Sequence, residues 1–367
     1  MIKIFYFYVH KEEYYSSSPI VNNIKILFNN HPLFNENNIE LTSMLEYLPE
    51  YNKKQMQFNI SIEKMNEDLS KAIENILIIL PEIVDKYDKI IFLGFHPTPF
   101  QPFIRHYKKI KKYKNIKTIL WQDDLHAYFI DDERKNKLNF ADHIITPSPI
   151  YFENVAPEYL LKSSFFFYSA DFEENKDFCY KWENRINKII LSGCVNEGYK
   201  IRANILKEIK INNDFAKIAD FIKKPRSREC EYDEKDKKNL PFGKNYYKKL
   251  GQYKGAFFGY YEYPKNFNLA KIIEILSMGC IGFFEYSPLL EKELGLIPMI
   301  HYVPCTELSE QLNKNNKLIT DVNYYNYYLN NIDGKGLEIA ENGKEHIRKY
   351  FSNNNGINNY LKIFKNI

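Results

Sequence analysis

The sequence predicts an α/β protein made of two doubly wound, Rossmann-like domains that face each other across a cleft. At 367 residues the chain exceeds the size at which a single hydrophobic core stops growing. Short apolar runs alternate with helix-length segments, and the alternation starts again after a polar stretch at residues 168–187. Parallel strands need crossover connections, so we expect helices on both faces of each sheet.

Buried parallel strands read as short, continuous apolar runs. In the first half of the chain such runs lie at residues 2–9, 24–28, 89–95, 116–121 and 143–146. Helices are expected at 62–86, broken or kinked near Pro81, and at 102–112, the second with a basic exposed face.

The second half repeats this order of elements. Its expected strands lie at residues 188–192, 216–222, 254–259, 280–285 and 298–303, and its expected helices at 199–210 and 269–278. We therefore divide the chain into a domain at 1–172, a linker at 173–187, a second domain at 188–345 and closing helices at 346–367.

Net charge, cysteine content and the length of apolar runs indicate which partners and which cellular compartment to expect. The 51 basic and 47 acidic residues nearly cancel, to a net charge of +4, which is too weak to attract nucleic acid over the whole surface. The five cysteines are scattered and form no CxxC pair, which favours a reducing compartment. No apolar run approaches the roughly 20 residues of a spanning helix. We therefore expect a cytoplasmic protein without a nucleic-acid partner.

The stretch NLAKIIEILSMGCIGFFE, residues 268–285, carries the most informative helix. Its apolar residues share one face, whereas Lys271 and Glu274 lie on another, and Gly279 is a natural C′ residue. The helix amino end can face an anion, with Lys271 adding a charge and Glu274 accepting hydrogen bonds from two ribose hydroxyls. The alternative is an exposed i,i+3 ion pair with no ligand.

A second candidate site lies in LSGCVNEGYKIRANILKE, residues 191–208. A strand ends at Ser192 and Gly193, and after a loop a helix begins near Tyr199, Lys200 and Arg202. Backbone donors and cations at one helix amino end form the outline of a phosphate site. An ordinary strand-to-helix turn with surface cations remains the alternative.

The stretch WQDDLHAYF, residues 121–129, places polar side chains after a buried strand, at the edge where α/β folds bind ligands. Asp124 is a candidate base for an acceptor hydroxyl, and His126 a candidate contact to a sugar or to developing charge. Asp123 and Asp124 could instead cap a helix, and a metal site is the less favoured alternative. His96, which follows the strand at 89–95, is expected to be structural.

The segment KIIEILSMGCIGFFE resembles the donor-binding segment of GT-B "group 1" glycosyltransferases, whose pattern is roughly K-x-x-E-x-x-x-x-G-x-x-x-x-x-E. Lys271, Glu274, Gly279 and Glu285 stand at those positions. The resemblance implies that Glu274 binds the nucleotide ribose and that Lys271 approaches the diphosphate. The chain departs from the retaining branch at Asn266, where that branch has a glutamate.

Two further segments are similar to parts of the same family. Residues 191–208 resemble the first strand-loop-helix of the donor domain, which implies that Lys200 and Arg202 clamp the diphosphate. The tail at 341–364 resembles the closing helices, the last of which commonly crosses back to the first domain. We expect His346, in that tail, to lie on the surface.

The resemblance implies a glycosyltransferase without cofactor or metal. The domain at 188–345 would bind a nucleotide diphosphate sugar, and the domain at 1–172 a glycan, lipid-linked or protein-linked acceptor. A nucleotide-sugar epimerase and an inactive glycan-binding or scaffolding protein are the alternatives. Residues 103–114 could make a peripheral membrane contact, or could simply be a solvated basic helix face.

Overall fold

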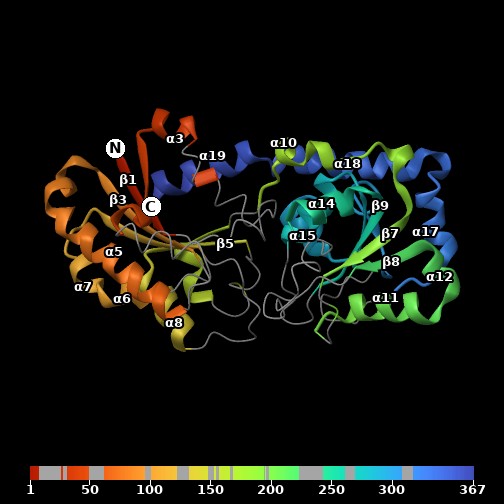
Figure 1. Cartoon of the computed structure of the whole chain (residues 1–367), viewed down its shortest axis with the longest axis horizontal. Helices are drawn as coiled ribbons and strands as arrows, with labels where there is room; N and C mark the ends of the chain where they lie inside the picture. The colour runs from red at the N-terminus through yellow and green to blue at the C-terminus, as the bar shows by residue number, and fades with distance from the viewer. Residues whose placement is uncertain are drawn as a thin grey trace. The chain divides into compact units, whose positions relative to one another are not determined.

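The computed structural model describes residues 1–7, 26–27, 31–48, 62–95, 101–121, 132–147, 153, 157–165, 168–193, 195, 198–222, 243–260, 269–307 and 317–367. The chain forms two compact units, and each is built around its own parallel sheet (Figure 1). The first unit includes the segment Asn23–Phe167 and the terminal helix in Asn354–Ile367, and the second includes Tyr168–Asn353. The predicted α/β class with two parallel sheets is confirmed.

The sheet of the first unit has six parallel strands in the order β2-β1-β3-β4-β5-β6. Its strands are β1 (Ile2–Phe7), β2 (Ile39–Ser43), β3 (Lys89–Phe95), β4 (Ile116–Trp121), β5 (His143–Thr146) and β6 (Ser163–Phe165). The strand order reverses at β1, which pairs with β2 on one side and β3 on the other, as in other doubly wound sheets.

Both faces of this sheet are covered, as the alternation along β4 shows. Ile116 and Leu120 join the apolar cluster that packs under helix α5 (Ile62–Ile83). Trp121 stacks at 5.9 Å, centroid to centroid, on Tyr360 of the terminal helix α19 (Asn353–Asn366). The terminal helix of the chain thus belongs to the core of the first unit.

The remaining helical elements of this unit are short. They are α3 (Pro32–Glu36), η1 (Met44–Tyr47), η2 (Val84–Lys86), α6 (Gln101–Arg105), α7 (Tyr107–Ile110), α8 (Asp132–Phe140) and η3 (Pro157–Lys162).

The sheet of the second unit has five parallel strands in the order β11-β10-β9-β7-β8. Its strands are β7 (Ile186–Ser192), β8 (Ala219–Ile222), β9 (Tyr253–Phe258), β10 (Ile281–Phe284) and β11 (Val303–Pro304). From β7 the chain passes to β8 on one side, and then returns to β9 on the other side. The switch point of this sheet, where ligands bind in such folds, is therefore the edge between the ends of β7 and β9.

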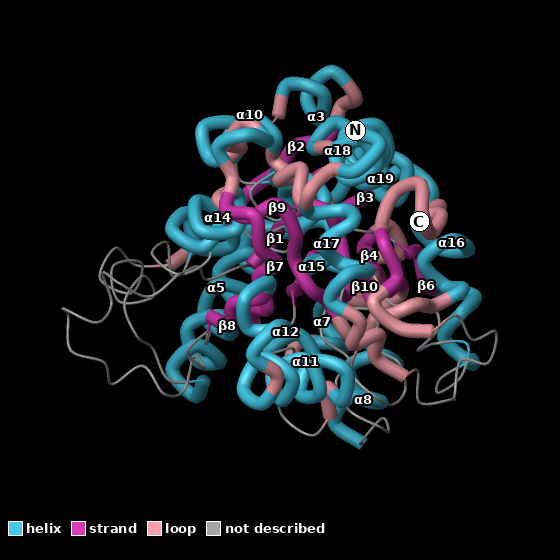
Figure 2. Tube along the Cα trace, turned by 90° about the vertical axis from the view of Figure 1, so that its right-hand side faces the viewer, coloured by secondary structure: helices cyan, strands magenta, loops and turns pink. Residues whose placement is uncertain are grey.

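Helices pack on this sheet over an aromatic core in which Phe215, Phe257, Phe283 and Tyr325 are buried. Figure 2 shows α11 next to α12 at the foot of the unit. The helices are α10 (Phe172–Asn175), α11 (Lys200–Ile211), α12 (Asn213–Ile218), α14 (Gly243–Gly251), α15 (Leu269–Ser277), α16 (Pro288–Leu294), α17 (Val322–Leu329) and α18 (Lys335–Tyr350), with one-turn helices η4 (Lys176–Phe178), η5 (Trp182–Asn184) and η6 (Ile332–Gly334).

Several predicted elements are wrong in detail. Ile26 and Leu27 are helical, not part of a strand, and residues 216–218 belong to α12, so that β8 begins only at Ala219. Residues 298–302 form turns before β11, and the helix expected at 102–112 is interrupted at His106. Strands β2 and β6 lie at the sheet edges and are half-exposed, so they lack the continuous apolar run that identified the central strands.

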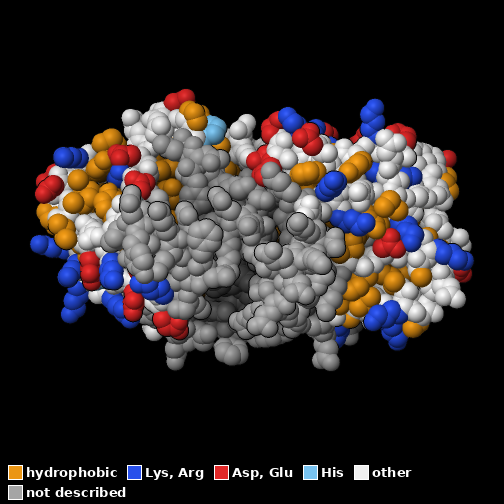
Figure 3. Space-filling model, in the orientation of Figure 1, with side chains coloured by type: hydrophobic (Ala, Val, Ile, Leu, Met, Phe, Trp, Pro, Cys, Tyr) orange, Lys and Arg blue, Asp and Glu red, His pale blue; other side chains and the backbone are white. Residues whose placement is uncertain are grey.

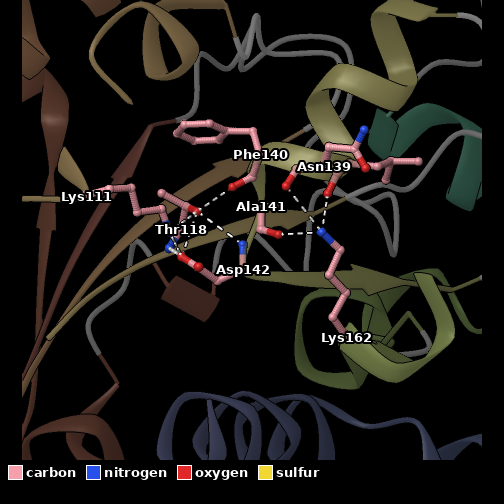
Figure 4. A network of polar contacts seen from close by, with 8 residues as sticks. Lys111, Thr118, Asn139, Phe140, Ala141, Asp142 and Lys162 are labelled. Carbon is pink, nitrogen blue, oxygen red and sulfur yellow. Dashed lines mark hydrogen bonds and ion pairs between the residues drawn. The ribbon is translucent and has the colours of Figure 1, made fainter. Parts of the chain in front are cut away.

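Asp142 ties β4 to β5 through a polar network (Figure 4). Its carboxylate pairs with the ammonium group of Lys111 and accepts the backbone N–H of Thr118 at 2.7 Å. Burial alone would raise the pKa of Asp142, but the hydrogen bonds and charge of Lys111 together with Thr118 hold it below its ordinary value. Next to this network, Nζ of Lys162 donates to the carbonyl oxygens of Leu138 and Ala141. It thereby caps the C-terminus of α8.

We expect Asp142→Ala to lower the free energy of unfolding by about 2 kcal/mol at pH 7, because it leaves the Lys111 ammonium and a buried N–H unpaired. A lowered carboxyl pKa stabilises the folded state above the unfolded-state pKa and loses that effect as the pH falls. The difference between the two proteins should therefore shrink below about pH 4 in urea titrations. Asp214→Ala, which removes an exposed pair with Lys217, is the control and should leave the midpoint unchanged. A constant difference across pH would contradict this account.

Candidate functional site

The candidate site lies at the carboxyl edge of the second sheet, where its strand order reverses. Strand β7 ends at Ser192 and is followed by Gly193, and the adjacent strand β9 ends at Phe258 and is followed by Gly259. Helix α11 starts close to the end of β7, and helix α15 follows β9 along the chain. This placement brings two of the predicted segments, 191–208 and 268–285, to one edge of one sheet.

A buried ion pair occupies the first turns of α15. Nζ of Lys271 lies 2.7 Å from Oε2 of Glu274, and the two residues are only 9% and 6% exposed. The alternative of an i,i+3 ion pair is correct in that the two side chains pair, but wrong in that the pair is buried and not exposed. Removing two charges from water costs several kcal/mol per ion, so a buried pair of this kind needs further hydrogen bonds to persist.

Tyr246, from α14, supplies one of those hydrogen bonds. Its hydroxyl oxygen accepts from Nζ of Lys271 at 2.7 Å and lies 3.0 Å from Oγ of Ser192. The ammonium group also lies 4.1 Å from the centroid of the Tyr246 ring, which adds a cation–π contact. Tyr246 thereby connects the end of β7 to the start of α15.

Arg202, on the first turn of α11, is the second buried cation of the site. It is 4% exposed, donates from Nε to the carbonyl of Gly259 at 2.8 Å, and its guanidinium stacks 4.1 Å from the ring centroid of Tyr199. A side chain at Gly193 would begin 3.4 Å from Nη1 of Arg202, and Gly193 has a φ of +105° that other residues rarely adopt. Glycine at this position lets the backbone pass beside the guanidinium.

The two cations influence each other. Burial lowers the pKa of Lys271, Glu274 counteracts this by raising it, and the charge of Arg202 lowers it further. An anion bound between Lys271 and Arg202 would relieve their mutual repulsion and stabilise both charged forms. The site is thus suited to a phosphate group.

Two more polar groups complete the site. Glu285, which follows β10, accepts the backbone N–H of Tyr260 at 2.8 Å. The hydroxyl of Tyr247 is buried and makes no hydrogen bond to the described residues, and burial together with the charge of Glu274 raises its pKa well above the ordinary value. Buried hydroxyl groups are normally hydrogen-bonded, so this unpaired hydroxyl next to Glu274 distinguishes the site from an ordinary core.

The other predicted site residues are distributed as follows. Tyr199 is buried and precedes the first residue of α11, the exposed Lys200. Gly279 lies at the far end of α15, with a φ of +67°, where Nη1 of Arg185 donates to its carbonyl at 2.6 Å. It ends the helix as predicted, but it does not lie with Lys271.

The candidate catalytic residues Asp124 and His126, as well as Asp123, His96 and Asn266, lie outside the residues that the structure describes. Within the described part of the chain, no three His, Cys, Asp or Glu side chains are grouped so that they could hold a metal ion. The same part contains no helix long and apolar enough to cross a membrane.

Ser192 and Tyr246 are site residues whose roles the sequence did not indicate. Tyr246 lies on α14, the helix that precedes strand β9, and it belongs to none of the motifs discussed above. The only available signal was a polar aromatic residue on the face of α14 that packs inward, and that signal is too common to identify a site.

We expect Glu274→Leu to lower the free energy of unfolding by about 3–5 kcal/mol, because it leaves the Lys271 charge buried and unpaired. The double variant Lys271→Met/Glu274→Leu should regain most of this loss, since it replaces the pair with apolar groups. Urea titrations of the three proteins provide the measurement. Glu338→Leu, which breaks an exposed pair of identical spacing with Lys335, is the matched control and should leave the midpoint unchanged. Strictly additive losses in the double variant would argue against a coupled buried pair.

No family model and no curated protein matches this sequence. The structure, in contrast, is similar to an alpha-glucosyltransferase in complex with UDP and a 13-mer DNA containing a central A:G mismatch, with a TM-score of 0.59 and 10% identity over 100% of both chains. It is also similar to an alpha-glucosyltransferase in complex with UDP-glucose and DNA containing an abasic site, with a TM-score of 0.58 and 11% identity over 99% of both chains. The protein therefore has a GT-B glycosyltransferase-like fold, as the sequence motifs predicted.

Proposed function

We propose that this protein is a glycosyltransferase that moves a sugar from a nucleotide diphosphate sugar to a hydroxyl group. The observation that carries the proposal is the buried Lys271–Glu274 pair at the switch point of the second sheet. Buried titratable groups with a specific charge partner are concentrated at functional sites, and ligands of α/β folds bind at such an edge. Proteins of similar structure bind UDP and UDP-glucose, which supports a nucleotide-sugar donor.

In this proposal the acceptor oxygen attacks the anomeric carbon of the donor. The bond from that carbon to the diphosphate oxygen breaks, the diphosphate departs with the electron pair, and a base takes the acceptor proton. Lys271, Arg202 and Lys200 neutralise the leaving diphosphate, so no metal ion is required for that task. Asp124 is the proposed base and His126 the proposed contact to the donor sugar.

Glu274 is the proposed partner of the nucleotide ribose, whose two hydroxyls can donate to one carboxylate. Before a donor binds, Lys271 holds this carboxylate in place at 2.7 Å, and Tyr246 in turn holds Lys271. Because these two side chains are already held in place, little side-chain entropy is lost when a nucleotide binds. This favours tight binding of a matching nucleotide. Gly193 and Tyr199, beside Arg202, are proposed to leave room for the diphosphate, and Gly279 supports the site by ending α15.

We expect one of UDP, GDP and ADP to bind in calorimetric titrations, equally well with and without EDTA. Binding should weaken at least tenfold, about 1.4 kcal/mol, in Lys271→Met/Glu274→Leu, because both the ribose and the phosphate partner are lost. Circular dichroism checks that this variant is folded. Glu338→Leu, with its exposed pair, should bind as the unmodified protein does. If no nucleotide binds at millimolar concentration, the transferase proposal fails and a glycan-binding or scaffolding role becomes the better one.

The acceptor in the main proposal is a hydroxyl of a glycan, a lipid-linked sugar or a protein-linked sugar. A second candidate acceptor is DNA, because the alpha-glucosyltransferases of similar structure are in complex with DNA. A local observation favours it: basic side chains gather over α6 and α7 (Figure 3), and those exposed there are Arg105, Lys108, Lys109, Lys112 and Lys114. The near-zero net charge does not exclude a basic patch of this size.

If DNA is the acceptor, a 13-mer duplex should bind with an affinity that falls steeply with salt concentration. Lys108→Ala/Lys109→Ala should weaken binding and reduce the salt slope by about two, whereas Lys86→Ala/Lys362→Ala, which removes two exposed lysines elsewhere in the same unit, should not. Fluorescence anisotropy at several salt concentrations measures both quantities. If the two double variants show the same salt slope, the DNA acceptor is contradicted and the glycan, lipid-linked or protein-linked acceptors are retained.

A further inference from the structure

A pocket lies in the same unit, at the opposite end of the strands from the candidate donor site. It is formed between the end of α16, the turns at residues 295–302 and the last turns of α18, and its volume is about 1050 Å³. The turns lead directly into β11, so the pocket lies at the amino ends of these parallel strands, whereas the candidate donor site lies at their carboxyl ends. This volume is slightly above the roughly 300–1,000 Å³ typical of small-ligand pockets, so the pocket has room for a ligand of several rings.

Two histidines face each other in this pocket, with ring centroids 4.6 Å apart. Nδ1 of His301 accepts the backbone N–H of Ile297 at 2.9 Å, so the proton of this ring is on Nε2. Nε2 of His346 lies 2.7 Å from the carbonyl oxygen of Leu294 and must donate to it, so Nδ1 of His346 has a free lone pair. The pair therefore presents one hydrogen-bond donor and one acceptor, and neither makes another hydrogen bond to the described residues.

Burial favours the neutral form of both rings. Burial, with the neighbouring His346, lowers the pKa of His301 to about 4, and burial also lowers the pKa of His346. His346, which we expect on the surface, is half-buried: it bonds to the carbonyl of Leu294 and lines the pocket. The fixed tautomers also argue against a metal bridge between the rings, since the lone pair of His301 is already used by the backbone.

The rim of the pocket combines an aromatic surface with balanced charge. Tyr350 is 51% exposed, and its ring centroid lies 4.8 Å from that of His346. The carboxylates of Glu293 and Glu345 offset the cations Arg348 and Lys349, and Asn342 adds a neutral amide. Because the two carboxylates cancel the two cations, the rim gives no net attraction to a phosphorylated ligand, and the chemistry of the pocket fits a neutral polar molecule.

The turns that form one wall are held in a defined shape. Met299 has a φ of +64°, which is unusual for a bulky residue, and its N–H donates to the carbonyl of Tyr302 at 2.7 Å. Strained backbone conformations of this kind persist where the surrounding structure fixes them, and they are concentrated at binding sites. The His301 ring is thereby presented to the pocket in one orientation.

We propose that this pocket binds a neutral saccharide. A sugar hydroxyl both donates and accepts hydrogen bonds, so neighbouring hydroxyls can pair with Nε2–H of His301 and Nδ1 of His346. The C–H face of a sugar ring carries slight positive charge and can stack on the negative face of the Tyr350 ring. The site is separate from the candidate donor site and would hold an acceptor chain or a glycan near the enzyme without taking part in the reaction.

The test is ligand-observed NMR of the full chain with maltotriose and N,N′-diacetylchitobiose as probes. We expect at least one probe to bind with a dissociation constant of about 1–10 mM. Tyr350→Ala should weaken that binding about tenfold and Tyr350→Phe should retain it, because only the ring is needed for stacking. Tyr107→Ala, which removes a similarly exposed tyrosine in the first unit, is the matched control and should have no effect.

Nucleotide binding is measured on the same samples, so that a failure of this site is distinguishable from a failure of the donor site. Saccharide binding that is lost in Tyr350→Ala while nucleotide binding is unchanged supports the proposal. The proposal is overturned if neither probe binds at about 10 mM, or if binding survives both Tyr350→Ala and His346→Gln.

Discussion

The burial of Lys271 and Glu274 is the constraint on which the arrangement of the second unit depends. Helix α15 is buried from Ala270 to Ser277, so its two charged side chains have little contact with water and must be satisfied by their neighbours. They bond to each other, and Tyr246 accepts a hydrogen bond from the ammonium group. Because Tyr246 also contacts Ser192, the ion pair fixes α14 and α15 against the end of β7. Replacing a buried ion pair by apolar residues of similar volume is often neutral for stability, so the proposed ligand gives a reason why the charges are retained.

The topology of the sheet explains why the cations of two distant segments meet. The chain leaves β7 for β8 on one side and resumes at β9 on the other, so the ends of β7 and β9 are adjacent at the switch point of the sheet. Arg202 bridges this edge through its bond to the carbonyl of Gly259, stacked on Tyr199 and beside Gly193. The same geometry that defines the fold therefore assembles a site with two buried cations and a carboxylate.

The two edges of this sheet differ in their chemistry, and the difference follows from charge. At the carboxyl edge, buried cations repel each other and are suited to an anion. At the amino edge, two neutral imidazoles with fixed tautomers face a rim of balanced charge, which is suited to a neutral polar ligand. Helix α18 connects the two regions through the core, because it packs on α15 and also carries His346 and Tyr350. The same sheet can thus support the proposed nucleotide site at the carboxyl ends of its strands and the proposed saccharide site at their amino ends.

The sequence by itself determined the α/β class, the central strands and the spacing of Lys271, Glu274 and Gly279, because continuous apolar runs and helical periodicity depend on local composition. The sequence did not reveal the edge strands β2 and β6, whose half-exposed residues give no such signal. It also predicted strand at residues 298–302, which form turns held by backbone hydrogen bonds between residues three or four apart. Only the tertiary structure decided that the Lys271–Glu274 pair is buried, that Tyr246 joins it, and that His346 lies against His301. Burial and hydrogen-bond partners are set by residues far apart in the chain, and a single sequence carries no direct record of which of them meet.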